Sequence, residues 1–79
     1  MTDYSTITEL NLSYNGLTEL PDLSKYTNLK MLYCHYNKLT NLDNLPSTLT
    51  YLNCSNNPFN YNFELTLENI RKYNLENHK

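Results

Sequence analysis

Two cysteines, a histidine and two serines are the side chains of this chain whose types and spacing suggest chemistry. Cys34 and Cys54 lie 20 residues apart, and His35 directly follows the first of them. A thiol paired with an imidazole indicates nucleophilic catalysis. Two neighbouring thiols indicate a disulfide, and a larger set of ligands indicates a metal site. Adjacent residues on a strand point to opposite faces, which separates His35 from both thiols. We therefore expect no Cys–His pair, and two thiols are too few for a metal site.

Ser13, His35 and Ser55 recur at intervals of 22 and 20 residues, which would align them in a column on one face. A hydrolase built on a serine and a histidine also needs an orienting acid, an oxyanion donor and a pocket that excludes water. The column contains no carboxylate. We therefore expect no enzyme, no catalytic residue, no metal and no cofactor.

These spacings belong to a pattern that occurs three times in the chain. The pattern is L-x-x-L-x-L-x-x-N-x-L, with cysteine accepted at its sixth position. Its copies start at residues 7, 29 and 49, and they run over Ile7–Leu17, Leu29–Leu39 and Leu49–Phe59. Periods of 22 and 20 residues are typical of a solenoid, in which each repeat forms one coil.

The chain resembles the leucine-rich repeat family from Ile7 to Phe59. Its short cysteine-bearing repeats, with the phrases Thr18–Leu23 and Asn44–Leu49, look like those of bacterial effectors and giant DNA viruses. The resemblance implies an α/β solenoid, which is a short right-handed coil with a three-stranded parallel sheet on its concave face. It also implies a protein or peptide partner, bound without catalysis on that concave face.

The pattern divides a single domain, residues 1–79, into four parts. A polar N-terminal tail, residues 1–6, precedes repeats that start at 7, 29 and 49, and a C-terminal cap follows over 60–79. The first return segment has room for a short 3₁₀ or helical turn at Asp22–Tyr26. In the cap, Thr66 is a candidate N-cap of a helix whose Leu67 and Ile70 share a face. A degenerate fourth repeat over residues 70–78 is the alternative to this capping helix.

Alternation along each strand assigns one set of residues to the core and another to the turns. The side-chain amide of asparagine both donates and accepts, so it can pair backbone groups of a turn that would otherwise be buried unpaired. We expect the thiols to fill the core unbonded, with a disulfide as the alternative. The expected core residues are Leu10, Leu12, Leu32, Cys34, Leu52 and Cys54, and the expected structural ladder is Asn15, Asn37 and Asn57.

The remaining strand positions are exposed and rich in tyrosine. Tyrosine combines a large rigid ring with a hydroxyl group and is enriched at binding hot spots. The alternative explanation is that tyrosine is common in this chain and that neighbouring rings stabilise the sheet. The predicted partner-binding residues are Tyr14, Met31, Tyr33, His35, Tyr36, Tyr51 and Asn53.

A second functional hypothesis is assembly. The first repeat has no coil before it, so an unpaired strand would lie there beside apolar side chains. Ile7, Leu10 and Leu12 form this predicted oligomer edge. Because the cap would block the opposite end of the stack, the hypothesis predicts a homodimer rather than a fibre.

Charge and hydropathy limit the kinds of partner and the compartment. The net charge of −2 leaves no basic surface, so we expect neither nucleic acid nor a membrane as a partner. The apolar runs are too short for a membrane span, and the first residues lack the features of a signal peptide. We therefore expect a cytoplasmic protein, located in the cytoplasm of a host cell if it is viral.

Overall fold

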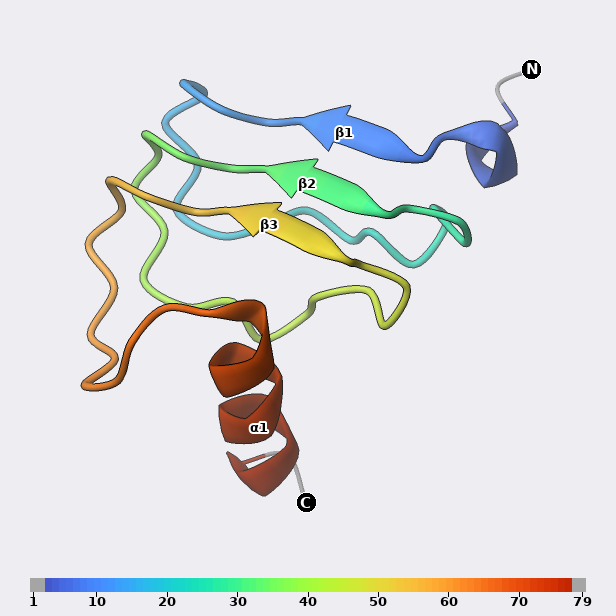
Figure 1. Cartoon of the computed structure of the whole chain (residues 1–79). Coiled ribbons are helices and arrows are strands. Elements are labelled where there is room, and N and C mark those ends of the chain that lie inside the picture. The colour runs from blue at the N-terminus through green and yellow to red at the C-terminus, as the bar shows by residue number, and fades with distance from the viewer. Residues whose placement is uncertain (1–2, 78–79) are drawn as a thin grey trace.

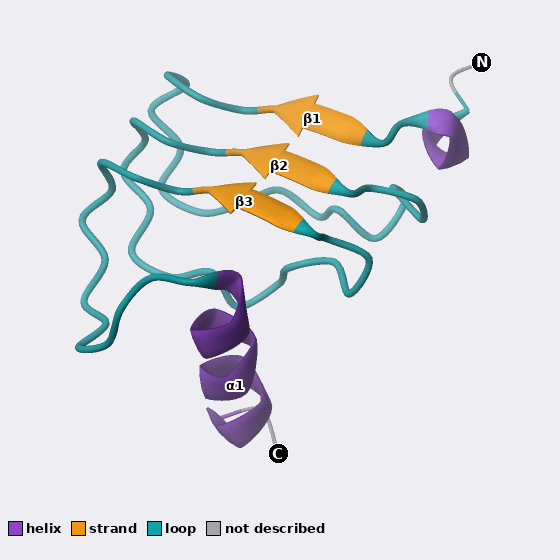
Figure 2. Ribbon diagram, viewed as in Figure 1, coloured by secondary structure: helices purple, strands orange, loops and turns teal. Residues whose placement is uncertain are grey.

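The computed structural model describes residues 3–77 and contains three coils stacked side by side (Figures 1 and 2). Each coil contributes one short strand, and all three strands run parallel in the order β1–β2–β3. The strands are β1 (Glu9–Asn11), β2 (Met31–Tyr33) and β3 (Tyr51–Asn53). A 3₁₀ turn, η1 (Tyr4–Thr6), precedes β1, and a helix, α1 (Leu67–Asn77), follows the third coil. The predicted three-stranded parallel sheet is therefore confirmed.

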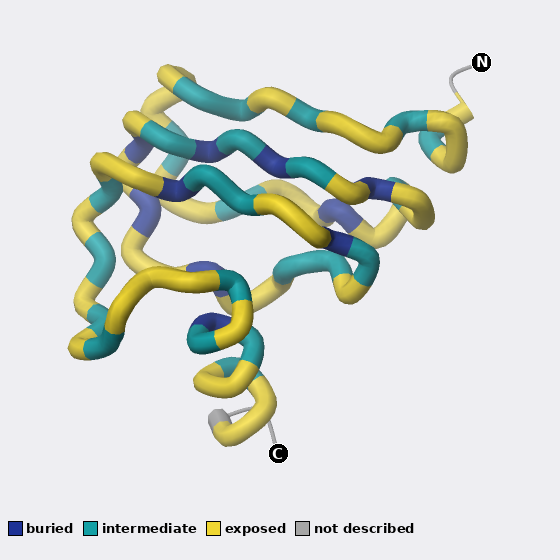
Figure 3. Tube along the Cα trace, in the orientation of Figure 1, coloured by how far each residue is buried: buried dark blue, intermediate teal, exposed yellow. Residues whose placement is uncertain are grey.

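The repeat pattern fixes the register of the sheet. Leu10 pairs with Leu32, which in turn pairs with Leu52, so equivalent residues of successive repeats lie side by side. Because residues on a strand alternate between faces, this register places one residue of each strand toward the return segments. In Figure 3 the buried positions fall both on the strand side of the coils and on the return side. The buried apolar residues are Leu23, Leu29, Leu32, Cys34, Leu39, Leu42, Leu49, Cys54 and Ile70.

The residues expected in the core do point toward it, but they are buried to different extents. Leu32 and Cys34 of the middle coil are fully buried, whereas Leu10, Leu12 and Leu52 are only half-buried against the core. The middle coil has a neighbour on each side, while the first and third strands each have a strand partner on one side only. A stack of three coils therefore has one well-buried layer and two partly open ends.

The asparagine ladder is present, and its middle member ties two coils together. Asn37 Oδ1 accepts hydrogen bonds from the amides of Asn15 and Leu17, both at 3.0 Å. Asn37 Nδ2 donates to the carbonyls of Leu12 and Cys34, both at 2.9 Å. Asn57 repeats the arrangement one coil later, accepting from the amide of Leu39 at 3.0 Å and donating to Cys34 O at 3.0 Å. Each of these amides satisfies backbone groups of its own coil and of the coil before it.

Asn15 is different, because within residues 3–77 its coil has a neighbouring coil on one side alone. In that part of the chain its Nδ2 donates to carbonyls of its own turn, those of Leu12 at 3.0 Å and Ser13 at 3.2 Å. Asn37 and Asn57 therefore each link two coils, whereas Asn15, at the same position of the first repeat, closes its own turn.

The return segments contain no helix, and the stretch Asp22–Tyr26, where a short 3₁₀ or helical turn is expected, forms a single turn only. The amide of Tyr26 donates to the carbonyl of Leu23 at 3.1 Å, which closes an isolated turn. Pro21 has no amide hydrogen and Asp22 caps the amide of Ser24 at 2.9 Å, so these side chains favour a turn over continued helix.

Residues 3–6 are not the simple tail expected from their polarity. The carboxylate of Asp3 accepts the amide hydrogen of Ser5 at 3.0 Å and thereby caps η1. The ring of Tyr4 packs edge-on against Tyr26 at 5.2 Å, and Asn28 Nδ2 donates to Ser5 O at 2.7 Å. Side chains of the first return thus hold the turn, a contact that local propensity does not reveal.

The C-terminal unit is a capping helix. The alternative, a degenerate fourth repeat over residues 70–78, is wrong for residues 70–77, which are helical. His78 lies outside the described residues. Thr66 Oγ1 accepts from the amide of Asn69 at 3.1 Å, as predicted for an N-cap. Ile70 is fully buried as part of the core. Among residues 3–77, no helix has the length and apolar character that a membrane span requires.

Two polar side chains of α1 attach the cap to the preceding coils. Arg71 Nη2 donates to three carbonyls, of which that of Leu49 is nearest at 2.6 Å, and Asn74 Nδ2 donates to Leu42 O at 2.8 Å. Tyr61 stands between the coils and the helix, with its hydroxyl oxygen accepting from the amide of Leu42 at 2.8 Å. These contacts span 19 to 32 residues of sequence.

The ladder generates a stability prediction. Asn37→Ala leaves the amides of Asn15 and Leu17 without their acceptor, whereas the carbonyls of Leu12 and Cys34 keep the side chains of Asn15 and Asn57 as donors. Each buried unpaired group costs about 1–3 kcal/mol, so we expect Asn37→Ala to lower the free energy of unfolding by about 2–6 kcal/mol and Asn15→Ala by about 1 kcal/mol. Urea unfolding followed by circular dichroism measures both. Equal losses at the two positions would contradict the inter-coil role of Asn37.

Candidate functional site

The exposed side of the sheet carries the residues predicted to bind a partner. On β2, Met31 and Tyr33 are half-buried and flank the fully buried Leu32, so they lie on the opposite side of the sheet from the core. On β3, Tyr51 and Asn53 flank Leu52 in the same way. The structure therefore places these residues on one surface, as the alternation of the strands predicts.

Five aromatic side chains on this surface contact one another, and we call them the tyrosine–histidine cluster. His35 lies at its centre, edge-on to Tyr14 at 5.7 Å, to Tyr36 at 5.8 Å and to Tyr33 at 6.4 Å. Tyr14 and Tyr36 stack on each other at 4.7 Å with their planes 9° apart. Tyr33 extends the cluster to Tyr51 at 5.6 Å. Of the seven predicted residues, Met31 and Asn53 lie on the same surface outside these ring contacts.

The stacked pair depends on an unusual backbone conformation. Tyr14 and Tyr36 have positive φ angles of 59° and 55°, and Asn56 occupies the equivalent position of the third repeat at 59°. A left-handed backbone costs a residue with a Cβ roughly 1–2 kcal/mol, and only asparagine tolerates it well. Here the amide of Tyr14 donates to His35 O at 3.2 Å and that of Tyr36 to Ser55 O at 3.0 Å, which holds the turns in place. Successive turns therefore present their rings side by side.

The serines of the column have structural partners instead of a catalytic one. Ser13 Oγ donates to Asn11 Oδ1, and Ser55 Oγ donates to Asn53 Oδ1 at 3.0 Å. Each asparagine also accepts the amide hydrogen of the same serine, which is a local turn at the end of the strand. Nδ1 of His35 is buried and has no hydrogen-bond partner among the described residues. Within residues 3–77, no carboxylate orients His35 and no hydrogen bond joins it to a serine.

Electrostatics on this surface are mild. The pKa of Tyr33 is raised, first by desolvation and then by the neighbouring carboxylate of Glu9. The phenol therefore keeps its proton and its hydrogen-bond donor at neutral pH. Among the described residues, no group of three or more histidine, cysteine or acidic side chains is arranged to hold a metal ion. The surface offers rings, hydroxyls and amides, which suit recognition of uncharged polar and apolar groups.

The two cysteines are buried and unbonded, as predicted. Cys34 is fully buried and Cys54 nearly so, and both are free thiols. Burial raises the pKa of Cys34 from its ordinary value of 9.0 to about 12, and it also raises the pKa of Cys54. A nucleophilic cysteine needs the opposite shift, because the thiolate is the reactive form. Both thiols therefore act as small apolar side chains.

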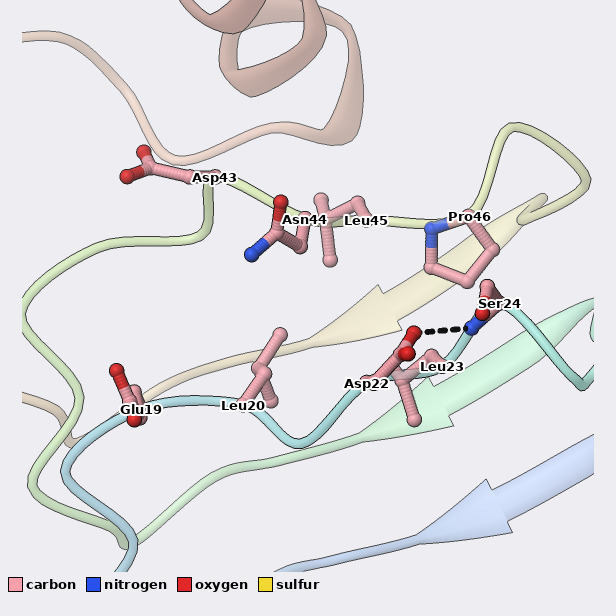
Figure 4. A pocket seen from close by; sticks show the side chains of 9 residues that line it. All are labelled: Glu19, Leu20, Asp22, Leu23, Ser24, Asp43, Asn44, Leu45 and Pro46. Carbon is pink, nitrogen blue, oxygen red and sulfur yellow. Dashed lines mark hydrogen bonds between the residues drawn. The ribbon is translucent and has the colours of Figure 1, made fainter.

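Sequence reasoning missed a pocket that lies between the return segments (Figure 4). This open pocket has a volume of about 640 Å³ and is lined by residues 19–20 and 22–24 of the first return and 43–46 of the second. Three of its lining residues, Glu19, Asp22 and Asp43, are acidic. The sequence carries a weak signal for this pocket, because the first period is two residues longer than the second and the two returns cannot match along their length.

The raised thiol pKa predicts a dependence of stability on pH. An unfolded Cys34 loses its proton near pH 9, whereas the folded thiol keeps it until about pH 12. Its contribution to stability is therefore complete below pH 9 and is lost as the pH rises toward 12. We expect the free energy of unfolding to fall more steeply from pH 8 to 11 in the wild type than in Cys34→Ala. Parallel profiles by urea unfolding would contradict burial of a protonated thiol.

Comparison with known proteins gives the family. A model described as Leucine Rich repeats (2 copies) matches residues 5–47, and one described as Leucine Rich Repeat matches residues 48–71. A search of curated proteins and of solved structures found no match. The second match includes the first residues of α1, 67–71. Leucine-rich repeats generally mediate protein–protein interaction and are typically not enzymes. With both matches together spanning residues 5–71, this chain belongs to the leucine-rich repeat family.

Proposed function

We propose that this chain is a non-enzymatic module that binds a protein or peptide through the tyrosine–histidine cluster, on the concave face expected of the repeat. The observation that carries the proposal is the continuous contact of five aromatic rings on an exposed surface. The exposed fractions of Tyr14, Tyr36 and Tyr51 are 69%, 48% and 44%. Large rings that are ordered by each other and still exposed lose little side-chain entropy when a partner covers them.

Stabilisation of the sheet alone does not account for this cluster well. Tyr14 is more than two-thirds exposed, so it removes little apolar surface from water, and its backbone is in the costly left-handed region. Strained backbone positions persist where the surrounding structure enforces them, and they gather at functional sites. Binding supplies a reason for placing a large ring at this position, whereas folding by itself favours asparagine, as in Asn56.

The size of the surface limits the partner. Three strands spaced about 4.8 Å apart form a patch well below the roughly 800 Å² per partner of a standard protein interface. A short peptide or a single protruding loop fits such a patch better than a flat protein surface does.

Because both thiols are free, we also propose a cytoplasmic location, where thiols stay reduced.

A homodimer is the second candidate function. It is favoured by β1, which pairs with a neighbour on only one side, and by the half-burial of the predicted edge residues Ile7, Leu10 and Leu12. Addition of a second β1 would pair the remaining backbone groups and cover these side chains. The strand is only three residues long, which makes this pairing weaker than the first candidate.

The binding proposal predicts a hot spot at Tyr33. Peptides selected from a displayed random library on the immobilised protein should bind the wild type and lose at least about tenfold in affinity with Tyr33→Ala. Fluorescence polarisation measures the affinity, and thermal unfolding checks the fold. Leu75→Ala is the matched control, because Leu75 is an exposed apolar residue on α1. If the selected peptides bind Tyr33→Ala as tightly as the wild type, or if the variant no longer folds, the role of Tyr33 is structural.

The dimer proposal predicts a concentration-dependent mass. Sedimentation velocity of the wild type over a hundredfold dilution should show dissociation, and Ile7→Lys should be monomeric throughout because it places a charge on the edge. A wild type that stays monomeric at the highest concentration rules the dimer out.

A further inference from the structure

Asn15 and Gly16 form the single asparagine–glycine pair of this chain, because Gly16 is its one glycine. The pair lies at the turn after β1, and both residues are exposed. An asparagine can react with its own chain when the amide nitrogen of the next residue reaches the side-chain carbon Cγ. Glycine favours this reaction, because it has no Cβ to hinder the approach.

The amide nitrogen of Gly16 is not engaged by the fold. Within residues 3–77 it has no hydrogen-bond partner, although the amides on either side, those of Asn15 and Leu17, both donate to Asn37 Oδ1 at 3.0 Å. Gly16 has a φ of +63°, and no atom beyond its chain neighbours lies within 4 Å of the place where a Cβ would be. The turn therefore leaves room around the attacking nitrogen.

The side chain of Asn15 is held less firmly than that of Asn37. Asn37 is 8% exposed and its Oδ1 accepts two amide hydrogens, whereas Oδ1 of Asn15 accepts none within residues 3–77. Nδ2 of Asn15 donates to the carbonyls of Leu12 and Ser13, but both bonds are on an exposed residue, where water competes for them. Breaking these two bonds is sufficient to release the side chain toward Gly16.

The equivalent pairs of the other two repeats are blocked from the same reaction. The amide of Lys38, which follows Asn37, donates to the carbonyl of Leu17 at 2.7 Å. Pro58, which follows Asn57, has no amide hydrogen to lose, so its nitrogen cannot attack. Of the three ladder asparagines, Asn15 is therefore the one that the structure leaves reactive.

We propose that Asn15 is a site of spontaneous deamidation, and that the isoaspartate formed there loosens the first coil from the second. In the first step the Gly16 nitrogen loses its proton to solvent base and bonds to Cγ of Asn15. The Cγ–Nδ2 bond then breaks as Nδ2 takes up a proton and leaves as ammonia, and a succinimide ring remains. In the second step water adds to either ring carbonyl and opens the ring, which gives aspartate or isoaspartate. Water is the only co-reactant.

Both products change the link between the first two coils. Aspartate has no amide hydrogen to donate to the carbonyls of Leu12 and Ser13, and its negative charge faces them. Isoaspartate also adds one carbon to the main chain between the amides of residues 15 and 17, which share the single oxygen Oδ1 of Asn37. The longer connection misplaces at least one of these amides. The inference uses no residue of the tyrosine–histidine cluster, so it is independent of the function proposed above.

The test follows the folded full chain during incubation at mildly alkaline pH in ¹⁸O-labelled water. Peptide mapping with electron-transfer fragmentation distinguishes aspartate from isoaspartate and detects the ¹⁸O that ring opening adds. We expect a mixture of the two acids at residue 15 before acid appears at any other asparagine. The rate should rise with pH, because the attacking nitrogen must lose its proton.

Two controls test the role of Gly16. Asn41 is the internal control, because it is exposed but is followed by Leu42. Gly16→Asn is the matched variant, because asparagine tolerates the positive φ of this position while its Cβ hinders the attack. This variant should lose most of the acid at residue 15. A folded chain whose Asn15 stays intact while the urea-unfolded chain reacts, or acid spread evenly over the asparagines, would overturn the site.

The structural consequence is measured on separated chains. Ion exchange separates the acid forms from the unmodified chain, and recombinant Asn15→Asp supplies the aspartate form alone. The fraction that contains isoaspartate should unfold at a lower urea concentration than Asn15→Asp, with faster hydrogen exchange at the amides of residues 15 and 17. Equal stability and equal exchange in the modified and unmodified chains would overturn the loosening of the first coil.

Discussion

One side-chain amide between two coils is the interaction on which the rest of this structure depends. A coil of about 20 residues cannot supply hydrogen-bond partners for all the backbone groups of its turn, because the amides and carbonyls at the end of the strand point into the stack. Asn37 bonds two of these amides and two of these carbonyls. It thereby fixes the distance and the register between the first and second coils. Once the register is fixed, the leucines of neighbouring strands lie side by side, and the core and the exposed surface follow from alternation.

The same constraint produces the surface on which function is proposed. The residue before each ladder asparagine adopts a left-handed backbone, and the hydrogen bonds of the turn hold it there even where it is tyrosine. Tyr14 and Tyr36 are therefore stacked by the repeat geometry, and His35 joins them to Tyr33. The outer coils place Asn–Ser pairs where the middle coil has Tyr33 and His35, so the aromatic character is greatest at the centre of the sheet.

A stack of only three coils makes its two ends as important as its middle. At the N-terminal end a 3₁₀ turn reaches the first return through Tyr4 and Ser5, but it leaves the outer edge of β1 unpaired. At the other end α1 buries Ile70 and binds carbonyls through Arg71. The sheet side and the return side of the coils differ as well, because within residues 3–77 backbone hydrogen bonds join neighbouring strands but do not join the two return segments. This difference opens a pocket on the return side of a protein whose sheet side is continuous.

The sequence by itself determined the three coils, the parallel register, the ladder and the position of the capping helix. Each of these depends on residues that recur at a fixed spacing or lie within one turn, such as Asn37 or Thr66, so local chemistry is sufficient. It also placed Met31, Tyr33, Tyr51 and Asn53 on one surface, because alternation on a strand is a local rule. Tyr14, His35 and Tyr36 follow from their recurring positions in the turns after the strands. Only the tertiary structure decided which rings touch, how Arg71 and Tyr61 fasten the helix, and that the returns separate to form a pocket. The contacts of Arg71 and Tyr61 and the walls of the pocket join residues about 20 or more positions apart that do not follow the repeat spacing. The ring contacts depend on side-chain orientation, which the packing of one coil on another sets.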